Sequence, residues 1–434
     1  MFKRANYAML SLIKPSSNCR IMEEFQEEFQ NNDMEYDNDD MTDTEDLSEG
    51  IDSCTLEPAL TNGEEFVRCG RYQFKTAAYV DEDKNAFTFP RYIRREDAVI
   101  EDVITDSALP FLPAKSLVRF KTICKGWNEW ISRPLFAHRQ AYSFRGMSGL
   151  FSQLSNGDPS FISLNRMVYG IPKPPLKFLP ESVQIISTCN GLLFCQGHDD
   201  DNAYYICNPA TKDWKRLPKP SLYHVSGPAA VLAFEPSRCI GVEYFLVRAV
   251  DLVYQPVIQF EVYSSTEGFW KVSDSIYYYD KEILIHGSVG FYMKGITYWE
   301  ISPGKALAFD LKEDLCGVQP LPSCSWPRGV LTEMHGELCY VRAYRQGNEC
   351  KIDIYGDIDM KLKRTIHLNP PDAGESSWGF QALPCLNSEL LIILVGKRIY
   401  SYHVKDQKLA LINSAGNNDM RYLPYVNSLV SLSC

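Results

Sequence analysis

The chain has 434 residues, a length that suits two or three domains. Hydrophobic residues make up 45% of it, and 25 tyrosines and 22 phenylalanines favour a sheet-rich globular core over a disordered chain. The longest apolar run, residues 390–395, has only the length of a strand, far short of the roughly 18 residues that a membrane-spanning helix requires. We therefore expect no membrane span.

The formal net charge of −11 is concentrated in one tract. Residues 23–65 hold 17 acidic residues and no lysine or arginine, whereas residues 1–22 hold four basic residues and no acidic one. The rest of the chain is close to neutral. We therefore expect neither nucleic acid nor a membrane surface as a partner, because both require a strong positive field.

The first 65 residues are predicted to form a disordered leader. Residues 1–22 have the basic, mildly apolar composition of a weak transit peptide, but their arginine content is low and the acidic tract follows directly. Residues 23–65 are poor in β-branched side chains, so they cannot bury enough apolar surface to offset the entropy of ordering. An acidic interaction tail is the alternative for this tract. Residues 66–97 are rich in aromatic side chains, which predicts a hairpin or a segment packed on a neighbouring domain.

Residues 109–140 carry the periodicity of helices. Pro113 and Pro134 bracket the segment, because proline cannot lie deep inside a helix, and Ser132 is placed to cap a helix that begins near Pro134. The apolar positions between the prolines are three or four residues apart and form one narrow stripe, composed of Leu117, Phe120, Cys124, Trp127 and Ile131. A unit of about 40 residues has too small a core to be stable alone, so the stripe needs a partner. Periodicity leaves open whether that partner is the chain's own larger domain, with the helices as a lid, or another protein.

Residues 112–136, LPAKSLVRFKTICKGWNEWISRPLF, resemble the F-box of a large group of plant proteins. The positions that match the pattern of that group are Leu112, Pro113, Lys115, Ser116, Leu117, Arg119, Phe120, Lys121, Cys124, Lys125, Trp127, Ile131, Pro134 and Phe136. The front departs from the pattern. The usual opening Leu-Pro-x-Asp-Leu-Ile is replaced by Val-Ile-Glu-Asp-Val-Ile at residues 99–104, which keeps the acidic and apolar character but not the Leu-Pro pair.

The resemblance implies that residues 98–142 form an F-box, an element that in its family docks on a Skp-family adaptor and through it on a cullin scaffold. Carried over to this sequence, the implied adaptor-binding residues are Ile104, Leu109, Leu112, Pro113, Leu117, Phe120, Cys124 and Trp127.

From about residue 145 to residue 434 the pattern changes to short β-prone runs separated by turn residues. A strand at residues 191–195 is followed by a second at 204–207, a turn at 208–213 and a third strand that contains Trp214. Equivalent turns recur at intervals of 55, 46, 47 and 47 residues, at Thr211, Thr266, Lys312, Asp359 and Asp406. One further step back reaches a turn-like stretch at Asn165.

This period predicts four-stranded sheets repeated as the blades of a β-propeller, with about six blades. Residues 425–432 have the pattern of a strand, and pairing of that strand with the first blade would close the ring and remove its open sheet edges. The region also resembles the F-box-associated, kelch-like domain of plant F-box proteins. The stretches that carry this likeness are residues 189–193 (CNGLL), 208–211 (NPAT), 217–220 (LPKP) and 425–432.

The sequence contains none of the common catalytic motifs, neither a GxSxG elbow, nor a glycine-rich phosphate loop, nor an HExxH pair. Among the seven histidines His335 lies between two glutamates, and that position is more typical of a turn than of a catalytic base. The 14 cysteines include no CxxC pair, so we expect reduced, mostly buried thiols and neither a metal site nor a cofactor. The tryptophans of the repeats are interpreted as packing residues between blades: Trp214, Trp270, Trp299, Trp326 and Trp378.

Two functions remain. The first is a non-catalytic receptor subunit, located in the nucleus or the cytoplasm, in which the F-box binds a Skp-family adaptor and the propeller captures a protein substrate for ubiquitination. The second is a propeller enzyme or ligand-binding protein that uses the helices as a lid. The resemblance favours the first.

Overall fold

The computed structural model describes two short strands at residues 66–69 and 72–75, then residues 104–105, and residues 108–432 apart from gaps. The gaps are residues 145, 155–156, 165–170, 172–174, 199–202, 223–228, 235–242, 253–254, 280–288, 303, 323–328, 348, 369–379 and 387–388. The chain divides into two units, Met1–Leu56 and Glu57–Cys434, and all described residues belong to the second. The predicted disordered leader, residues 1–65, lies outside the described residues.

Two local elements precede the helices. Strands β1 (Phe66–Cys69) and β2 (Tyr72–Lys75) pair antiparallel as a hairpin, one of the two arrangements expected of residues 66–97. Residues 104–105 form a helical turn, and the carbonyl of Ile104 accepts the N–H of Ala108 at 3.1 Å. Of the atypical front of the F-box-like segment, only this turn is described.

The helical unit, residues 108–144, consists of η1 (Leu109–Phe111), α4 (Ala114–Phe120), α5 (Lys125–Ile131) and α6 (Pro134–Ser143). Pro113 directly precedes α4 and Pro134 is the first residue of α6, as the sequence predicts. The expectation that Ser132 caps α6 is wrong. Arg133 precedes α6 in the extended conformation (ψ 136°) that a residue before proline prefers, so Ser132 ends α5 instead.

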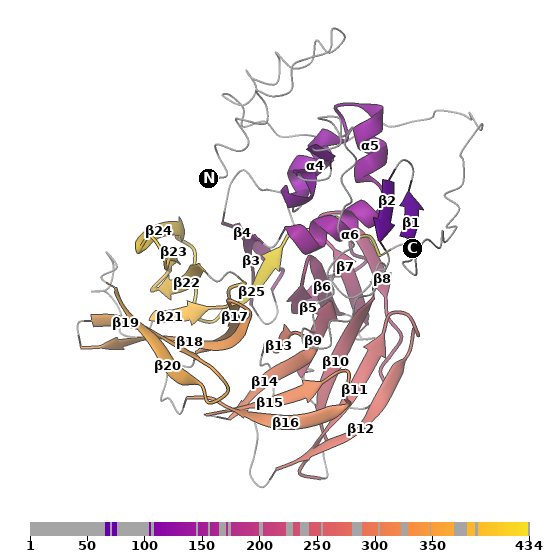
Figure 1. Cartoon of the computed structure of the whole chain (residues 1–434). Helices are drawn as coiled ribbons and strands as arrows, with labels where there is room; N and C mark the ends of the chain where they lie inside the picture. The colour runs from indigo at the N-terminus through magenta and orange to yellow at the C-terminus, as the bar shows by residue number, and fades with distance from the viewer. Residues whose placement is uncertain are drawn as a thin grey trace. The chain divides into compact units, whose positions relative to one another are not determined.

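Six antiparallel sheets follow as the blades of a β-propeller (Figure 1). The first blade combines β25 (Arg421–Val426) with β3 (Met147–Gln153) and β4 (Ser160–Ser163). The strands of the second and third blades are β5 (Val183–Cys189), β6 (Leu192–Gly197), β7 (Tyr204–Asn208), β8 (Asp213–Arg216), β9 (Ala229–Phe234), β10 (Tyr244–Asp251), β11 (Val257–Ser264) and β12 (Trp270–Tyr278).

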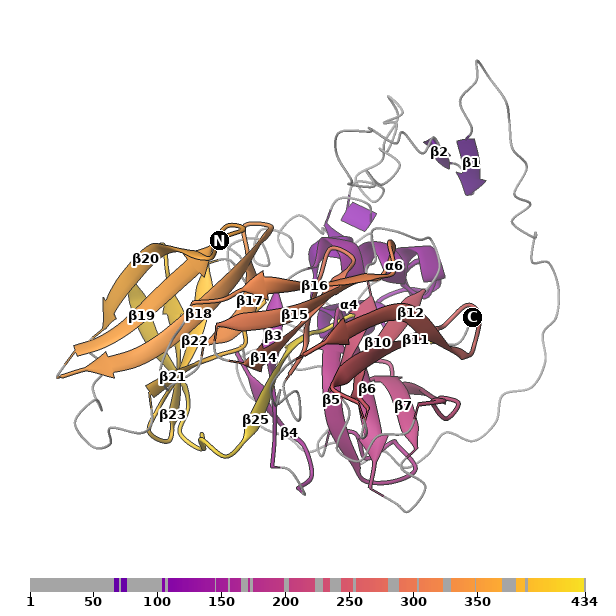
Figure 2. The same cartoon turned by 90° about the horizontal axis from the view of Figure 1, so that it is seen from below.

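The strands of the fourth, fifth and sixth blades are β13 (Phe291–Met293), β14 (Ile296–Ser302), β15 (Lys305–Asp310), β16 (Leu315–Pro320), β17 (Val330–Met334), β18 (Glu337–Gln346), β19 (Glu349–Gly356), β20 (Lys361–Leu368), β21 (Phe380–Leu383), β22 (Leu390–Val395), β23 (Arg398–His403) and β24 (Lys408–Asn413). Successive blades contact each other through inner strands, such as β5 with β9 and β9 with β13, and in places through outer strands, such as β4 with β24. Figure 2 shows the blades from below.

The predicted repeat is confirmed at the level of the turns. The connection between the third and fourth strands of each of the second to sixth blades contains one of the five predicted turn positions, namely Thr211, Thr266, Lys312, Asp359 and Asp406. The sixth predicted position, Asn165, lies outside the described residues.

The ring closes between the two ends of the propeller, as predicted, but through a strand that begins earlier. Strand β25 pairs antiparallel with β3, from Arg421 opposite Gln153 to Val426 opposite Met147. Residues 427–432 contain no strand. They are nevertheless buried as far as Val430, which is only 1% exposed, so this irregular segment must satisfy its backbone groups in another way.

The apolar core lies between neighbouring blades. Trp299 of the fourth blade is fully buried against Phe260 of the third, and Phe260 in turn stacks on Phe309 with ring centroids 4.4 Å apart. Trp270 packs between the third and second blades. The prediction of packing tryptophans is confirmed for these two, whereas Trp214 is 44% exposed. Trp326 and Trp378 lie outside the described residues.

Candidate functional site

The stripe predicted in the helical unit divides into buried and accessible side chains. Leu117 is 0% exposed, Ile131 1% and Trp127 7%. Phe120 is partly buried and meets the indole of Trp127 edge to face, with ring centroids 5.4 Å apart. Cys124 is exposed, and its Sγ caps α5 by accepting the N–H of Trp127 at 3.4 Å. Most of the stripe is therefore buried within the chain.

The eight predicted adaptor-binding residues differ in the same way. Leu109, Leu117 and Trp127 are buried within the chain, so their side chains pack internally in this structure. The side chains that remain accessible, at least in part, are Ile104, Leu112, Pro113, Phe120 and Cys124. Contact of any of them with an adaptor stays a prediction.

Periodicity missed the most accessible apolar side chains of the unit. Phe111 is 51% exposed, Val118 47% and Leu135 38%. Val118 lies one residue beyond the buried Leu117, which turns it about 100° around α4 and off the stripe. The sequence nevertheless carried a signal for them. An apolar residue at a position that helical periodicity places on the solvent side is not explained by internal packing, which makes it a candidate contact residue.

The helical unit is also strongly basic. Residues 108–144 contain a single carboxylate, Glu129, and six cationic side chains: Lys115, Arg119, Lys121, Lys125, Arg133 and Arg139. Partial burial, and to a lesser degree the charge of Arg119, lowers the pKa of Lys115 below its ordinary value, and burial does the same to the pKa of Lys121. In this stretch cationic side chains outnumber carboxylates by six to one, a balance that favours an acidic partner.

The CNGLL motif forms a tight hairpin between β5 and β6. Asn190 and Gly191 have positive φ values of 43° and 92°, the combination that a two-residue turn of this kind requires. The side-chain amide of Asn190 donates to the carbonyl of Phe234 in the next blade at 2.7 Å. At Gly191 a Cβ would lie 2.0 Å from Oγ of Ser428, so only glycine fits against the C-terminal segment. The motif is structural.

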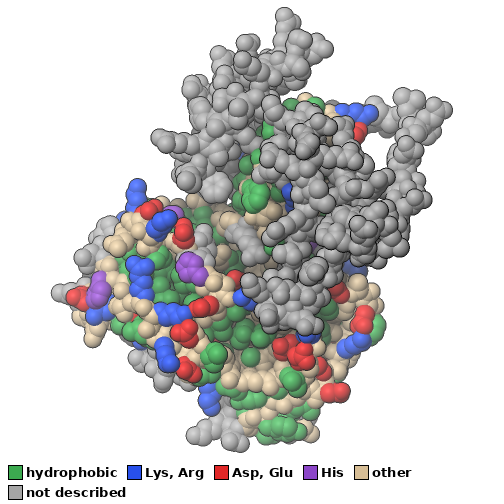
Figure 3. All heavy atoms as spheres, viewed as in Figure 1, with side chains coloured by type: hydrophobic (Ala, Val, Ile, Leu, Met, Phe, Trp, Pro, Cys, Tyr) green, Lys and Arg blue, Asp and Glu red, His purple; other side chains and the backbone are tan. Residues whose placement is uncertain are grey.

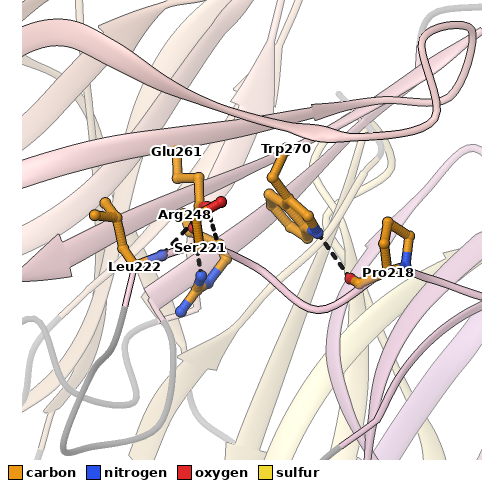
Figure 4. A network of polar contacts seen from close by, with 6 residues as sticks. All are labelled: Pro218, Ser221, Leu222, Arg248, Glu261 and Trp270. Carbon is orange, nitrogen blue, oxygen red and sulfur yellow. Dashed lines mark hydrogen bonds and ion pairs between the residues drawn. The ribbon is translucent and has the colours of Figure 1, made fainter.

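The LPKP motif borders a buried ion pair between the second and third blades (Figure 4). The carbonyl of Pro218 accepts the indole N–H of Trp270 at 2.9 Å. Arg248 and Glu261 face each other across β10 and β11, with Nη1 and Oε2 2.6 Å apart and both side chains 0% exposed. The other carboxylate oxygen, Oε1, accepts the N–H of Ser221 at 2.6 Å. The carboxylate therefore joins the third blade to the segment that leaves the second.

This ion pair was not predicted, although the sequence carried a signal for it. Arg248 and Glu261 each interrupt an apolar strand at a position whose neighbours on both sides point into the core. A charge in such a place needs an opposite charge nearby. Because no substrate can reach fully buried groups, we assign the pair to the fold and not to catalysis.

The described part of the propeller surface carries charges of both signs. Over β18–β20 lysine and arginine side chains lie among aspartates and glutamates (Figure 3). Lys363 forms ion pairs with both Glu337 and Asp357. Within the described residues, no three His, Cys, Asp or Glu side chains come together as a metal site would require. Nor does any helix in the same part of the chain have the length and apolarity to cross a membrane.

Comparison with known proteins gives consistent matches. The family model described as the β-propeller of F-box protein At3g26010-like matches residues 164–368. From Arabidopsis thaliana, F-box protein At5g07610 is 28% identical over 58% of this chain and 65% of its own length. F-box protein At5g49610 is 31% identical over 29% of this chain and 34% of its own. F-box/kelch-repeat protein At3g23880 is 24% identical over 52% of this chain and 66% of its own.

Each of these matches spans less than two thirds of the relative. The family model matches a part of the chain that lies within the six blades described above. Over these stretches the chain is therefore similar to plant F-box proteins that carry a β-propeller domain.

Proposed function

We propose that the chain is the substrate-recognition subunit of a ubiquitin ligase of the Skp–cullin–F-box type. The observation that carries this proposal is the exposure of Phe111 and Val118 on a helical unit in which Leu109, Leu117 and Trp127 are already buried. Apolar side chains that remain exposed beside buried ones are suited to a protein interface. The printed names of the relatives, which are F-box and F-box/kelch-repeat proteins, support the same assignment.

In this proposal the chain carries out no bond chemistry. The helical unit binds a Skp-family adaptor, and through it a cullin, while the propeller holds a protein substrate. Tethering raises the effective concentration of substrate lysines near the ubiquitin-transferring enzyme, which accelerates the transfer without any catalytic residue in this chain. We propose the nucleus or the cytoplasm as the place of action, because buried free thiols such as Cys195 and Cys207 suit a reducing compartment.

In this proposal the predicted adaptor-binding residues have two different roles. The accessible members of the predicted set, with Phe111 and Val118 added, form the proposed contact surface. The buried members shape that surface from within. The basic residues around it favour an adaptor face that carries acidic side chains, since charge complementarity speeds and orients docking.

Titration calorimetry with a purified Skp-family adaptor tests this proposal. Fully burying a Phe or Val side chain is worth about 1.5–3 kcal/mol. Phe111 and Val118 are each about half exposed, so docking can add about 1 kcal/mol apiece. The double change Phe111→Ala with Val118→Ala should therefore weaken binding at least about tenfold, since about 1.4 kcal/mol is a factor of ten. The melting temperature should stay almost unchanged, because neither side chain belongs to a core.

A matched control truncates two apolar side chains of the propeller that are even more exposed, Leu315 at 64% and Ile358 at 84%. The double change Leu315→Ala with Ile358→Ala should leave adaptor affinity as it is. If the unmutated chain binds no adaptor, and the Phe111 and Val118 variant melts at a lower temperature, the helices act as a lid and the proposal fails.

A further inference from the structure

Residues 427–431 lie between the helical unit and the propeller. Strand β25 leads toward α6 (Figure 1), and residues 427–431 continue beyond it without regular structure. Asn427 and Ser428 are each 1% exposed, and Leu429 is 7% exposed. A buried irregular segment cannot satisfy its backbone groups with water, so neighbouring side chains must do so. We call residues 427–431 the C-terminal clasp.

Gln140 of α6 holds the clasp from the side of the helical unit. Its side chain is 0% exposed. Nε2 donates to the carbonyl of Leu112 in the helical unit at 3.2 Å and to that of Asn427 in the clasp at 3.5 Å, and Oε1 accepts the N–H of Leu429 at 3.1 Å. One amide group thus bonds the loop before α4 and the clasp at the same time.

The second blade holds the clasp from the other side. Nδ2 of Asn208, the first residue of the NPAT motif, donates to the carbonyls of Ser428 and Val430 at 3.0 and 2.6 Å. The hydroxyl of Ser431 donates to the carboxylate of Asp213 at 2.6 Å. Val430 shares an apolar cluster with Ala141 of α6 and with side chains of the second blade.

We infer that the clasp fixes the orientation of the helical unit on the propeller, with Gln140 as the positioning residue. Only residues 144–146 connect α6 to β3. So short a link limits the distance between the helical unit and the propeller, but it does not by itself prevent the unit from rotating. The bonds of Gln140 and Asn208 on opposite sides of one segment remove that rotation. This inference rests on the proposed function, because a fixed orientation decides which lysines beside the propeller come within reach of the ubiquitin-transferring enzyme.

The variant Gln140→Leu tests the inference, since it keeps the approximate size of the side chain and removes its three bonds. Gln153→Leu is the matched control. Gln153 is also a buried glutamine, 3% exposed, that bonds backbone groups, but its partners are Gly157, Val183 and Ile185 inside the propeller. Both variants lose a buried amide, and only the first loses a bond between the helical unit and the clasp.

Hydrogen exchange of full-length protein, measured on peptides that cover residues 134–143 and 421–432, gives the first readout. Gln140→Leu should raise exchange in both peptides at least about tenfold, because loss of buried hydrogen bonds shifts a local opening equilibrium by about that factor. Gln153→Leu should leave both peptides protected. Asn208→Ala, which releases the clasp from the propeller side, should reproduce the effect of Gln140→Leu.

The second readout is the pattern of ubiquitinated lysines on the chain itself in a ligase reconstituted with a Skp-family adaptor. Gln140→Leu should bind the adaptor within about threefold of the parent while its acceptor lysines change, and Gln153→Leu should keep the parent pattern. Unchanged exchange and an unchanged pattern in Gln140→Leu would overturn the inference. Absence of adaptor binding by the parent would refute the proposed function, and the exchange experiment would still decide whether the clasp holds the unit.

Discussion

Removal of one partner of the buried Arg248–Glu261 pair should destabilise the propeller more than any other single change of charge in the described blades. The change Glu261→Ala leaves a guanidinium with 0% exposure and no opposite charge. It also removes the acceptor of the Ser221 N–H. Breaking a buried pair in this way costs about 3–5 kcal/mol, against a total stability of about 5–15 kcal/mol for a typical domain.

A double variant distinguishes the cost of leaving one buried charge unpaired from the contribution of the ion pair itself to the free energy of unfolding. Arg248→Met with Glu261→Gln leaves no buried charge, and the glutamine carbonyl can still accept the Ser221 N–H. It should therefore be more stable than Glu261→Ala, because replacing both charges avoids the desolvation cost that made the single change expensive. We expect a cost of about 2 kcal/mol or less for the double variant.

Urea unfolding followed by tryptophan fluorescence measures both effects, since the ring centroid of Trp270 lies 5.7 Å from Cζ of Arg248. The control is Glu267→Gln, which breaks a solvent-exposed pair with Lys271 in the same blade and should cost less than about 1 kcal/mol. If Glu261→Ala costs no more than this control, or if the double variant costs as much as Glu261→Ala, the pair does not join the second and third blades as its geometry indicates.

Three further outcomes can be measured. Gly191→Ala should lower the free energy of unfolding by more than about 2 kcal/mol, because it combines left-handed backbone strain with the clash at Ser428. Its control is Gly336→Ala, where φ is also positive but the nearest atom is 3.5 Å away, and it should cost about 1 kcal/mol. Deletion of residues 421–434 should give an aggregating protein by circular dichroism and light scattering, because it exposes the edge of β3. Adaptor affinity should fall several-fold between about 0.05 and 0.5 M salt, since the helical unit is basic and exposed charges are screened; an increase would contradict the charge argument.

The blades could be predicted because each repeat contains its own signal. Positions such as Thr211 and Asp406 lie in turns between the third and fourth strands, and a turn is specified by a few adjacent residues. The same holds for the prolines that begin α4 and α6, whose effect on the backbone is local. Repetition of local signals therefore gave the architecture without any knowledge of long-range contacts.

The C-terminal segment shows where local signals end. Residues 427–432 have the composition of a strand, but the carbonyls of Ser428 and Val430 bond Asn208, a residue distant in the sequence. Gln140, near the other end of the fold, accepts the N–H of Leu429. Nothing in the segment itself indicates that side-chain amides, and not a neighbouring strand, will satisfy its backbone. How the backbone groups of residues 427–432 are satisfied depends on which side chains the closed propeller places beside them.

The adaptor-binding residues raise a related difficulty, because periodicity identifies core positions better than contact positions. A stripe with helical spacing marks the side on which a helix buries apolar side chains, and the first surface to be covered is the one inside its own unit. Leu117 illustrates this, since it matches the F-box pattern and is fully buried. Leu117→Ala would open a cavity worth about 2–5 kcal/mol in the small helical unit and weaken adaptor binding by loosening the unit. Phe111→Ala should weaken binding while the unit stays folded, so helix protection in hydrogen exchange distinguishes the two residues.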